Sequence, residues 1–445
     1  MMVEDHMTAE DVVALAKKLG ADDVVAQLMT SNNMQVKFAN SAIAITQNWS
    51  SMALEVFVAY KKRTAGVTLE NLDHAVVRSS IERLLKIARN SQPNKDWAGL
   101  AHGPFKYAKP KDTYDASLVA NEDKAIDWVN AAIAATKTPK TAGVLYITDE
   151  GKTVATSEGV GAQDRSTSAQ FSIRAFFEHD ESGHAVTASC NSAGFNPEAA
   201  GVKAGELAKA ARKPQPGRSG KYDVIFDPLA FAGLLASVST SASAYSVDAG
   251  YSFLADKIGK KVAGPHVTIL DDPTAAGGLG SVAFDDEGRP TQRVPVIENG
   301  LLKTYLHNTL TAKKFNAAST ASAGLISPHP RNAMLQPGNQ SRDELFSQVK
   351  NGIYVTNIWY TRFQNYRTGD FSTIPRDGLF IIRNGELWQP VKGLRITDNL
   401  QRLLENIVAL SNKPETILWW GMDDQIPSTT PYVLVKDLNL TLPTM

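Results

Sequence analysis

The sequence predicts an α+β protein of two domains, the second mostly antiparallel β-structure around a buried central helix. Three observations lead to this prediction. Amphipathic helical patterns and alternating apolar runs follow each other along residues 1–212, which is typical of helices and antiparallel meanders. Residues 213–221, KPQPGRSGK, are rich in Pro, Gly and charge, as in a linker between domains. Residues 222–445 contain mainly alternating runs separated by turn signals.

The first domain is expected to contain two similar sets of elements. Each set is a helix, a group of strands and a second helix, an order that is compatible with an internal duplication. In the second set, GVLYITDEG and TVATSEG are expected as two separate strands, followed by AQFSIRAFFE and HAVTASC. The expected ranges are 8–20, 34–70 and 81–88 for the first set, and 126–133, 143–190 and 196–212 for the second.

The second domain has clear hairpin and capping signals. Asn299-Gly300 and Asn384-Gly385 each lie between alternating apolar runs, which predicts type I′ turns. Ser341 and Glu344 have the spacing of a capping box. The other expected elements are the strands GKYDVIFDP, HVTILDD, GSVAFDDEG and TPYVLVKDLNL and a last helix striped by Leu400, Leu403, Leu404 and Ile407.

The expected central helix begins in the stretch FDPLAFAGLLASVSTSASAYSVDAG, residues 226–250. Asp227 is a good N-cap, and Pro228 stands at the first helical position, where a missing N–H costs nothing. An apolar stripe then leads into a run of small hydroxyl residues without charge. Because Ser and Thr compete for the backbone's hydrogen bonds, the run favours a helix whose small face packs closely against another element.

Composition limits the classes of function. Among 445 residues, Lys+Arg and Asp+Glu number 46 each, so no net charge favours nucleic acid or an anionic membrane as a partner. The single cysteine, Cys190, excludes an intrachain disulfide and fits a reducing compartment. The acidic N-terminus resembles no signal peptide, and no apolar run is long enough to span a bilayer. We therefore expect a soluble, cytoplasmic protein.

Motifs that carry chemistry are weak or missing. His179 and His184 are five residues apart around Ser182-Gly183, so a polar hairpin tip is favoured over a metal site. The glycine-rich turn at 277–280 has no helix signal after it, which argues against phosphate binding. Cys190 has no basic neighbour in its strand and is expected to be an inert buried thiol.

The C-terminal half resembles the TldD/TldE (PmbA) family, once called modulators of DNA gyrase. The resemblance rests on DDPTAAGGLGSVAFDDEGRPTQRVPVIENGLLKTYLHN, SPHPRNAMLQPGNQSRDELFSQVKNGIYV, TGDFS and FIIRNGELWQPVKGLRITDNLQRLLENI, and it covers residues 220–445. It implies a peptidase system in which a zinc-bearing TldD-type chain carries a His-Glu-x-x-x-His helix and a C-terminal Cys ligand. A TldE-type partner lacks these residues, and the pair is expected to enclose a chamber for small unfolded peptides.

By this resemblance the zinc ligands are absent here. After Leu234-Leu235, Ala236 stands at the first His position, Ser237 replaces the Glu and Ser241 replaces the second His. The C-terminal stretch TILWWGMDDQIPSTTP contains no Cys. Methyl and hydroxyl side chains are not zinc ligands at neutral pH, so no metal and no catalytic residue is expected in this chain, and zinc is expected in a TldD-like partner.

The resemblance leaves two functions and a weaker third. The chain is expected to be a non-catalytic subunit beside a TldD-like partner, or alternatively a homodimeric protein that holds peptides without cutting them. The third is an enzyme that uses residues outside the family pattern, such as the His179/His184 pair. A segment rich in aromatic and basic residues suits a peptide-binding lining, with an ordinary packed loop as the alternative. The expected contacts are Trp359, Tyr360, Arg362, Tyr366 and Arg367.

Overall fold

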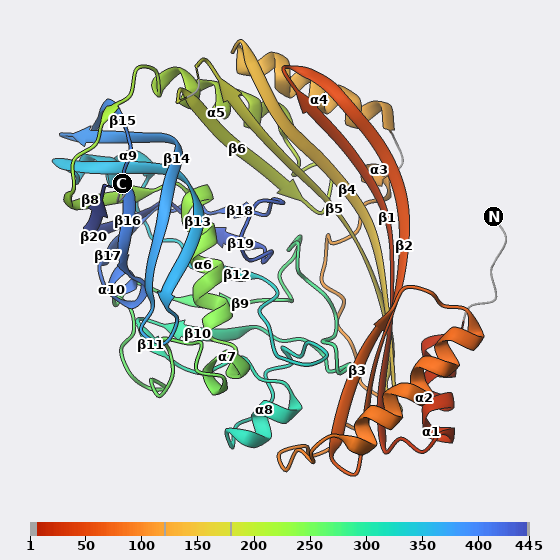
Figure 1. Cartoon of the computed structure of the whole chain (residues 1–445). Helices are drawn as coiled ribbons and strands as arrows, with labels where there is room; N and C mark the ends of the chain where they lie inside the picture. Colours follow the sequence, from red (N-terminus) through yellow and green to blue (C-terminus); the bar gives the residue numbers. More distant parts are fainter. Residues whose placement is uncertain (1–6, 120–121, 179, 443–445) are drawn as a thin grey trace.

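The computed structural model describes residues 7–119, 122–178 and 180–442 (Figure 1). Both expected sets of strands lie in one six-stranded antiparallel sheet, in the order β3-β2-β1-β4-β5-β6. Each set contributes three strands, and β1 pairs with β4 to join the sets. The strands are β1 Asp23–Ala39, β2 Ala42–Tyr60, β3 Arg63–Leu69, β4 Lys140–Thr156, β5 Gly161–Phe176 and β6 Ser182–Ser189. The separation of GVLYITDEG from TVATSEG was wrong, because β4 runs through both.

Helices pack on the two ends of this N-terminal sheet (Figure 1). One end carries α1 (Ala9–Lys18) and α2 (His74–Asn90), and the other carries α3 (Ala116–Val119), α4 (Glu122–Thr136) and α5 (Pro197–Ala210). Thr8 caps α1 and Asn196 caps α5, as predicted. Gly201 and Gly205 let α5 approach α4 closely, since a Cβ at either position would lie 2.2 or 2.1 Å from a carbonyl oxygen of α4.

The C-terminal domain contains two sheets. The larger has the order β13-β8-β20-β16-β14-β15-β7, with β17 on β20, and the β13–β14 pairing closes it on itself. The smaller has the order β11-β10-β9-β12-β19-β18. Most pairs are antiparallel, and the parallel pairs are β13–β8, β12–β19 and β15–β7.

The bounds of the C-terminal strands are β7 Gln215–Pro216, β8 Gly220–Phe226, β9 Ile269–Asp271, β10 Val294–Glu298, β11 Leu301–Leu302, β12 Ala333–Leu335, β13 Asn351–Asn365, β14 Asp370–Arg383, β15 Glu386–Lys392, β16 Arg395–Asn399, β17 Ile407–Leu410, β18 Glu415–Ile417, β19 Ser428–Thr430 and β20 Val433–Thr441. The helices are α6 Pro228–Ser241, α7 Ala244–Asp248, α8 Thr309–Lys314, α9 Arg342–Ser347 and α10 Leu400–Glu405. The α+β class with a buried central helix, α6, is thereby confirmed.

Some of the hairpins, caps and strands predicted for this domain are present, and others are not. Both Asn-Gly hairpins are present, with φ of 50° and 81° at 299–300 and 49° and 84° at 384–385, and Ser341 and Glu344 form the capping box of α9. The expected strand GSVAFDDEG is instead a loop with one isolated bridge, from Phe284 to Pro290. The last helix ends at Glu405, so Ile407 belongs to β17.

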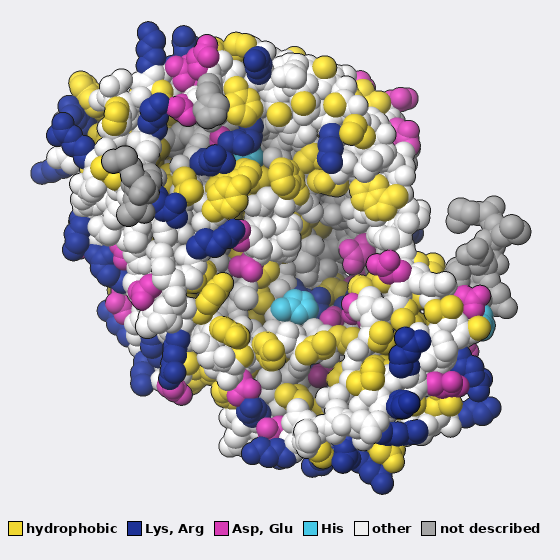
Figure 2. All heavy atoms as spheres, viewed as in Figure 1, with side chains coloured by type: hydrophobic (Ala, Val, Ile, Leu, Met, Phe, Trp, Pro, Cys, Tyr) yellow, Lys and Arg dark blue, Asp and Glu magenta, His cyan; other side chains and the backbone are white. Residues whose placement is uncertain are grey.

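The two parts of the chain face each other across a hollow. In Figure 1 the long strands β1, β2, β4 and β5 curve along one side, opposite α6, α7 and the loops around β9 and β12. Figure 2 shows the surface hollowed between them. Among the described residues, no helix combines the length and apolar character needed to cross a membrane.

Candidate functional site

The helix α6 is fixed at its N-terminus by a buried polar cluster. The carboxylate of Asp227 accepts a hydrogen bond from the backbone N–H of Leu229 (3.0 Å), and Tyr354 donates its hydroxyl to the same carboxylate (2.7 Å). Lys203 on α5 lies 3.2 Å from Asp227. Burial alone would lower the pKa of Lys203, but the charges of Asp227 and Glu415 outweigh it and raise the pKa. This anchor joins α6 to the N-terminal half of the chain.

The middle of α6 carries the three positions where the family pattern has metal-site residues. Ala236 is fully buried, and Ser237 donates its hydroxyl to Gly233 O and Asp424 Oδ2, both at 3.2 Å. Ser241 donates to Ser237 O at 2.8 Å. These side chains bind the helix backbone and one carboxylate, so the residues present do not fit a zinc ion. In the described ranges, no cluster of three or more His, Cys, Asp or Glu is placed to hold a metal.

The small face of α6 is densely packed. Ser239 is 2% exposed, and its Oγ and the Oγ1 of Thr240 are buried without a hydrogen-bond partner among the described residues. An unpartnered buried hydroxyl is destabilising by about 1–3 kcal/mol. The face is therefore tightly enclosed, as the hydroxyl run predicted, but it is not fully satisfied by its own chain.

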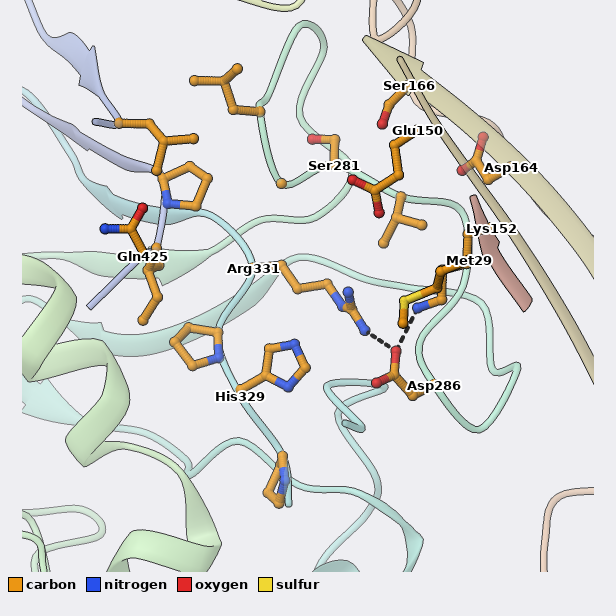
Figure 3. Close-up of a pocket in the computed structure, with 18 of the residues that line it drawn as sticks. Met29, Glu150, Lys152, Asp164, Ser166, Ser281, Asp286, His329, Arg331 and Gln425 are labelled. Atoms are coloured by element: carbon orange, nitrogen blue, oxygen red, sulfur yellow. Dashed lines mark hydrogen bonds and ion pairs between the residues drawn. The ribbon is translucent and has the colours of Figure 1, made fainter. Parts of the chain in front are cut away.

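A cleft of about 620 Å³ lies beside α6, between the N-terminal sheet and the C-terminal domain. One wall consists of cleft-facing residues of β1, β2, β4 and β5, including Glu150, Lys152 and Asp164. The opposite wall includes Thr240, Ser243 and Tyr245 at the end of α6 and on α7, the loops around Ser281 and His329, and residues 425–427. Figure 3 shows side chains of both walls directed into the same space.

The charged groups of the cleft centre on Asp286. Lys152 Nζ lies 2.5 Å and Arg331 Nη2 lies 2.8 Å from Asp286 Oδ1 (Figure 3). Burial would raise the pKa of Asp286, but these two cations outweigh it and hold the pKa well below its usual range. The cluster therefore ties β4 to the C-terminal domain.

Two further titratable groups line the cleft. Burial lowers the pKa of His329 to about 4, so its imidazole is neutral at pH 7. The side chain of Glu150 points into the space (Figure 3). Desolvation of its carboxylate by the surrounding protein raises its pKa.

The turn predicted within the histidine pair of the sequence does not lie at Ser182-Gly183. His179 lies outside the described residues, and His184 lies in β6, which begins at Ser182, so the predicted turn at Ser182-Gly183 was wrong. The ring of His184 is fully buried, with Nε2 2.9 Å from Ser172 Oγ and Nδ1 2.9 Å from Asn357 Nδ2. Burial lowers its pKa to about 4. His184 therefore joins β5 and β6 to β13.

The five candidate peptide-binding residues lie on β13 and the turn after it, not on a loop, since β13 extends to Asn365. Trp359 and Tyr360 are neighbours (ring centroids 5.9 Å apart), and Arg362 lies over the Tyr360 ring at 5.8 Å. Tyr366 stacks on Phe363, away from this group. The exposed members are Tyr360, Arg362, Tyr366 and Arg367.

These five residues are not among those that line the 620 Å³ cleft, but one contact links them to it. Trp359 packs on Trp419 with centroids 5.5 Å apart, and the preceding residue, Leu418, lines the cleft. Their role in peptide binding stays a prediction.

The cleft's own residues were missed by sequence reasoning. The Asp-Asp-Glu run at 285–287 was assigned to a strand, and Lys152 was left between two expected strands. Charged residues inside an alternating run could have signalled a sheet face that lines a polar cavity. Cys190 is buried as expected, and burial raises the pKa of its thiol to about 11.

Comparisons with known proteins agree with this geometry. Residues 219–442 match the model of the PmbA/TldA metallopeptidase C-terminal domain, and residues 117–212 match the central domain of the same family. A metalloprotease of Methanocaldococcus jannaschii is 34% identical over 224 residues, 48% of each chain. A metalloprotease PmbA homolog of Haemophilus influenzae is 26% identical over 419 residues, 91% of this chain and 90% of the other.

The chain therefore matches about half the length of the first of these relatives and most of the second. The solved structure of TldE from Thermococcus kodakarensis superposes with a TM-score of 0.86 at 19% identity, covering 97% of this chain and 99% of the other. At that identity the likeness establishes the fold. The family models together span more than half of the sequence, and the chain belongs to the PmbA/TldD metallopeptidase family.

Proposed function

We propose that this chain is a non-catalytic, TldE/PmbA-like subunit of a zinc metallopeptidase complex that processes or degrades small unfolded peptides. In this proposal a TldD-like partner supplies the zinc and the catalytic residues. The present chain holds peptide in the cleft beside α6. The complex is expected to be cytoplasmic, which fits a chain with a single, buried cysteine.

One observation supports the proposal: the chain keeps a cleft next to α6, while the α6 positions that the resemblance assigns to metal-site residues are Ala236, Ser237 and Ser241. The side chain of Ala236 is a methyl group. Ser237 donates a hydrogen bond to Asp424, and Ser241 donates one to the helix backbone. A zinc peptidase needs three ligands and a base for the attacking water. A chain that keeps the cavity without these groups is suited to binding peptide for a partner.

The lining of the cleft suits peptides of varied sequence. Its C-terminal wall includes hydroxyl and amide side chains, such as Ser246, Ser327 and Gln425. Such groups can bond to main-chain N–H and C=O, which every peptide carries. The exposed residues Tyr360, Arg362, Tyr366 and Arg367 would extend this surface, with Trp359 linking them to the cleft through Trp419.

The alternative is a homodimeric protein that binds peptides without cleaving them. It is favoured by the cleft itself, whose walls both come from this one chain. The third reading, an enzyme built on His184, gains no support, because that ring is buried and both its nitrogens lie within hydrogen-bond distance of neighbouring side chains.

The proposal is tested by producing the chain alone and together with a TldD-like protein that carries the His-Glu-x-x-x-His motif. We expect a complex by light scattering and cleavage of a fluorogenic peptide only when the zinc-bearing partner is present. We also expect metal analysis to find no stoichiometric zinc in the isolated chain. A monomer that leaves the partner's activity unchanged would remove the subunit proposal, and homodimers that bind peptide without a partner would favour the alternative.

A further inference from the structure

A second cavity, of about 330 Å³, adjoins the cleft. The two share Tyr245 and Asp286 in their linings, so they meet at α7 and at the loop that holds the ion cluster. This side pocket lies between the ends of β2 and β3 and the segment 308–326 of the C-terminal domain. Its volume falls at the lower end of the range for ligand sites, about 300–1,000 Å³.

The walls of the side pocket are largely apolar. Phe57 and Trp97 pack together with centroids 5.1 Å apart, and Leu310 and Leu325 complete the interior. At the rim, Ile326 is 72% exposed and Tyr245 is 50% exposed. Large apolar side chains exposed around an apolar hollow are typical of a binding site.

Four of the five charged side chains that line the side pocket, Asp248, Asp286, Glu287 and Lys314, have partners within the chain, and Asp96 is the fifth. Glu287 accepts hydrogen bonds from the N–H and the hydroxyl of Thr309, at 3.1 and 2.5 Å. Lys314 pairs with Asp248 at 2.6 Å, and Asp286 is held by Lys152 and Arg331. An anionic occupant would find no free counter-charge, because Lys314 is already paired with Asp248, whereas an apolar one would bury its surface against the walls.

We propose that the side pocket receives an apolar or aromatic side chain of a peptide whose backbone lies in the adjoining cleft. This inference rests on the proposed function, because it assumes that the cleft holds peptide. It adds a preference that the cleft alone does not supply, since hydrogen bonds to main-chain groups do not distinguish side chains.

Gly66 on β3 provides a way to fill the pocket. A Cβ at Gly66 would lie 3.7 Å from Val56 O and 3.9 Å from Leu325 Cδ2, which are ordinary contacts, so a side chain can be added there without a clash at its first atom. Gly66 itself lines the pocket. The matched control is Gly161 on β5, where an added Cβ meets nothing within 4 Å and which lines neither cavity.

The experiment measures binding of two fluorescein-labelled peptides to the full chain by anisotropy. Both are Gly-Ser peptides of equal length, one with a single central Phe and one with Ala at that position. We expect the Phe peptide to bind about tenfold more tightly, as burial of one aromatic side chain predicts. Gly66→Leu should abolish this preference and leave the affinity for the Ala peptide unchanged, while Gly161→Leu should change neither.

A second variant keeps the proposal testable if Gly66→Leu does not fold. Ile326→Ser alters only the exposed rim and is expected to reduce the Phe preference severalfold, with an unchanged melting temperature. Equal binding of the two peptides, or a Phe preference that survives Gly66→Leu in a folded protein, would overturn the side-pocket proposal and leave the subunit proposal standing. If neither peptide binds the chain or its complex with the zinc-bearing partner, both proposals fail together.

Discussion

The two walls of the cleft differ in the kind of polar group they carry. The sheet wall carries the titratable residues Glu150, Lys152 and Asp164, whereas the part of α6 that lines the cleft contributes the uncharged side chain of Thr240. The Lys152–Asp286–Arg331 cluster joins the charged wall to the loops below it. In a zinc peptidase of this family the helix would carry the reactive groups. Here charge is concentrated where the two parts of the chain are held together.

The difference separates two tasks that one cavity can perform. Lys152 of the sheet wall is paired with Asp286 and therefore stabilises the shape of the cleft, while the helix wall presents the small neutral side chain of Thr240. The following predictions test whether the charged wall is structural and whether the helix wall tolerates change.

The largest effect is expected from removing the centre of the charged wall. Asp286→Ala would leave Lys152 and Arg331 without their shared carboxylate. Removing one partner of a buried ion pair destabilises a protein by about 3–5 kcal/mol, and we expect a loss of this size in urea unfolding. The matched control is Asp343→Ala, whose carboxylate is 93% exposed and 3.6 Å from Arg342, and which should change stability by no more than about 0.5 kcal/mol. Equal effects of the two substitutions would contradict a structural role for the cluster.

A second effect concerns pH at the place where the sheet meets β13. Burial lowers the pKa of His184 from 6.5 to about 4, although the charge of Asp377 acts in the opposite direction. Between these values the unfolded chain binds the proton and the folded chain does not. The contribution of His184 to the free energy of unfolding is therefore fully present above pH 6.5. It decreases by about 3 kcal/mol as the pH drops from 6.5 to 4, and it does not change further below pH 4.

Urea unfolding at several pH values between 7 and 4 measures this contribution. The variant His184→Gln lacks the titrating ring and should lose stability more gradually over the same range, even if it is less stable at pH 7. Parallel pH profiles for the two proteins would assign the acid sensitivity to other groups.

Larger side chains on the small face of α6 are expected to destabilise the protein. Ser239 is 2% exposed on α6, so Ser239→Leu would overpack the site at a cost of about 1–3 kcal/mol. Ser239→Ala removes a buried hydroxyl that has no described partner and should be neutral or slightly stabilising. Thermal melting of both variants tests the pair, and a neutral Leu variant would mean that the small face of α6 is not closely packed.

The sequence predicted local elements well where a short signal decides them. Asp227 and Pro228 mark the start of α6, and the two Asn-Gly pairs mark their hairpins, because a cap or a positive φ needs particular residues. Long-range features were harder to predict. Lys152 fell between two expected strands, yet β4 continues through it, and its side chain meets a cavity and a distant carboxylate.

The same limit explains the missed cleft. Asp286 and Arg331 are 45 residues apart, and Lys152 is 134 residues from Asp286, so no local pattern could bring them together. The loop at 285–288 resembles a strand in sequence, but Asp285 turns it by accepting the N–H groups of Glu287 and Arg289. His184 looked exposed because a Ser-Gly pair precedes it, although Gly183 is needed for close packing on α5, where a Cβ would lie 2.2 Å from Ala204 O.

The smallest effect on stability is expected outside both walls, on the surface that β13 presents. Arg362 is 65% exposed in its side chain and lies 3.5 Å from Asp423, so Arg362→Ala should change the free energy of unfolding by no more than about 1 kcal/mol. If this surface holds peptide, the same substitution lowers the activity of the complex with the zinc-bearing partner severalfold, and Arg367→Ala does so as well. Lys221, whose side chain is 61% exposed in a comparable surface ion pair with Asp437, provides the control. It lies in β8, which pairs with residues 352–355 of β13 and not with residues 360–367. A fluorogenic peptide assay, with light scattering to verify that the complex persists, separates a loss of peptide binding from a loss of assembly. Activity that is equally insensitive to all three substitutions would confine peptide binding to the cleft between the two walls.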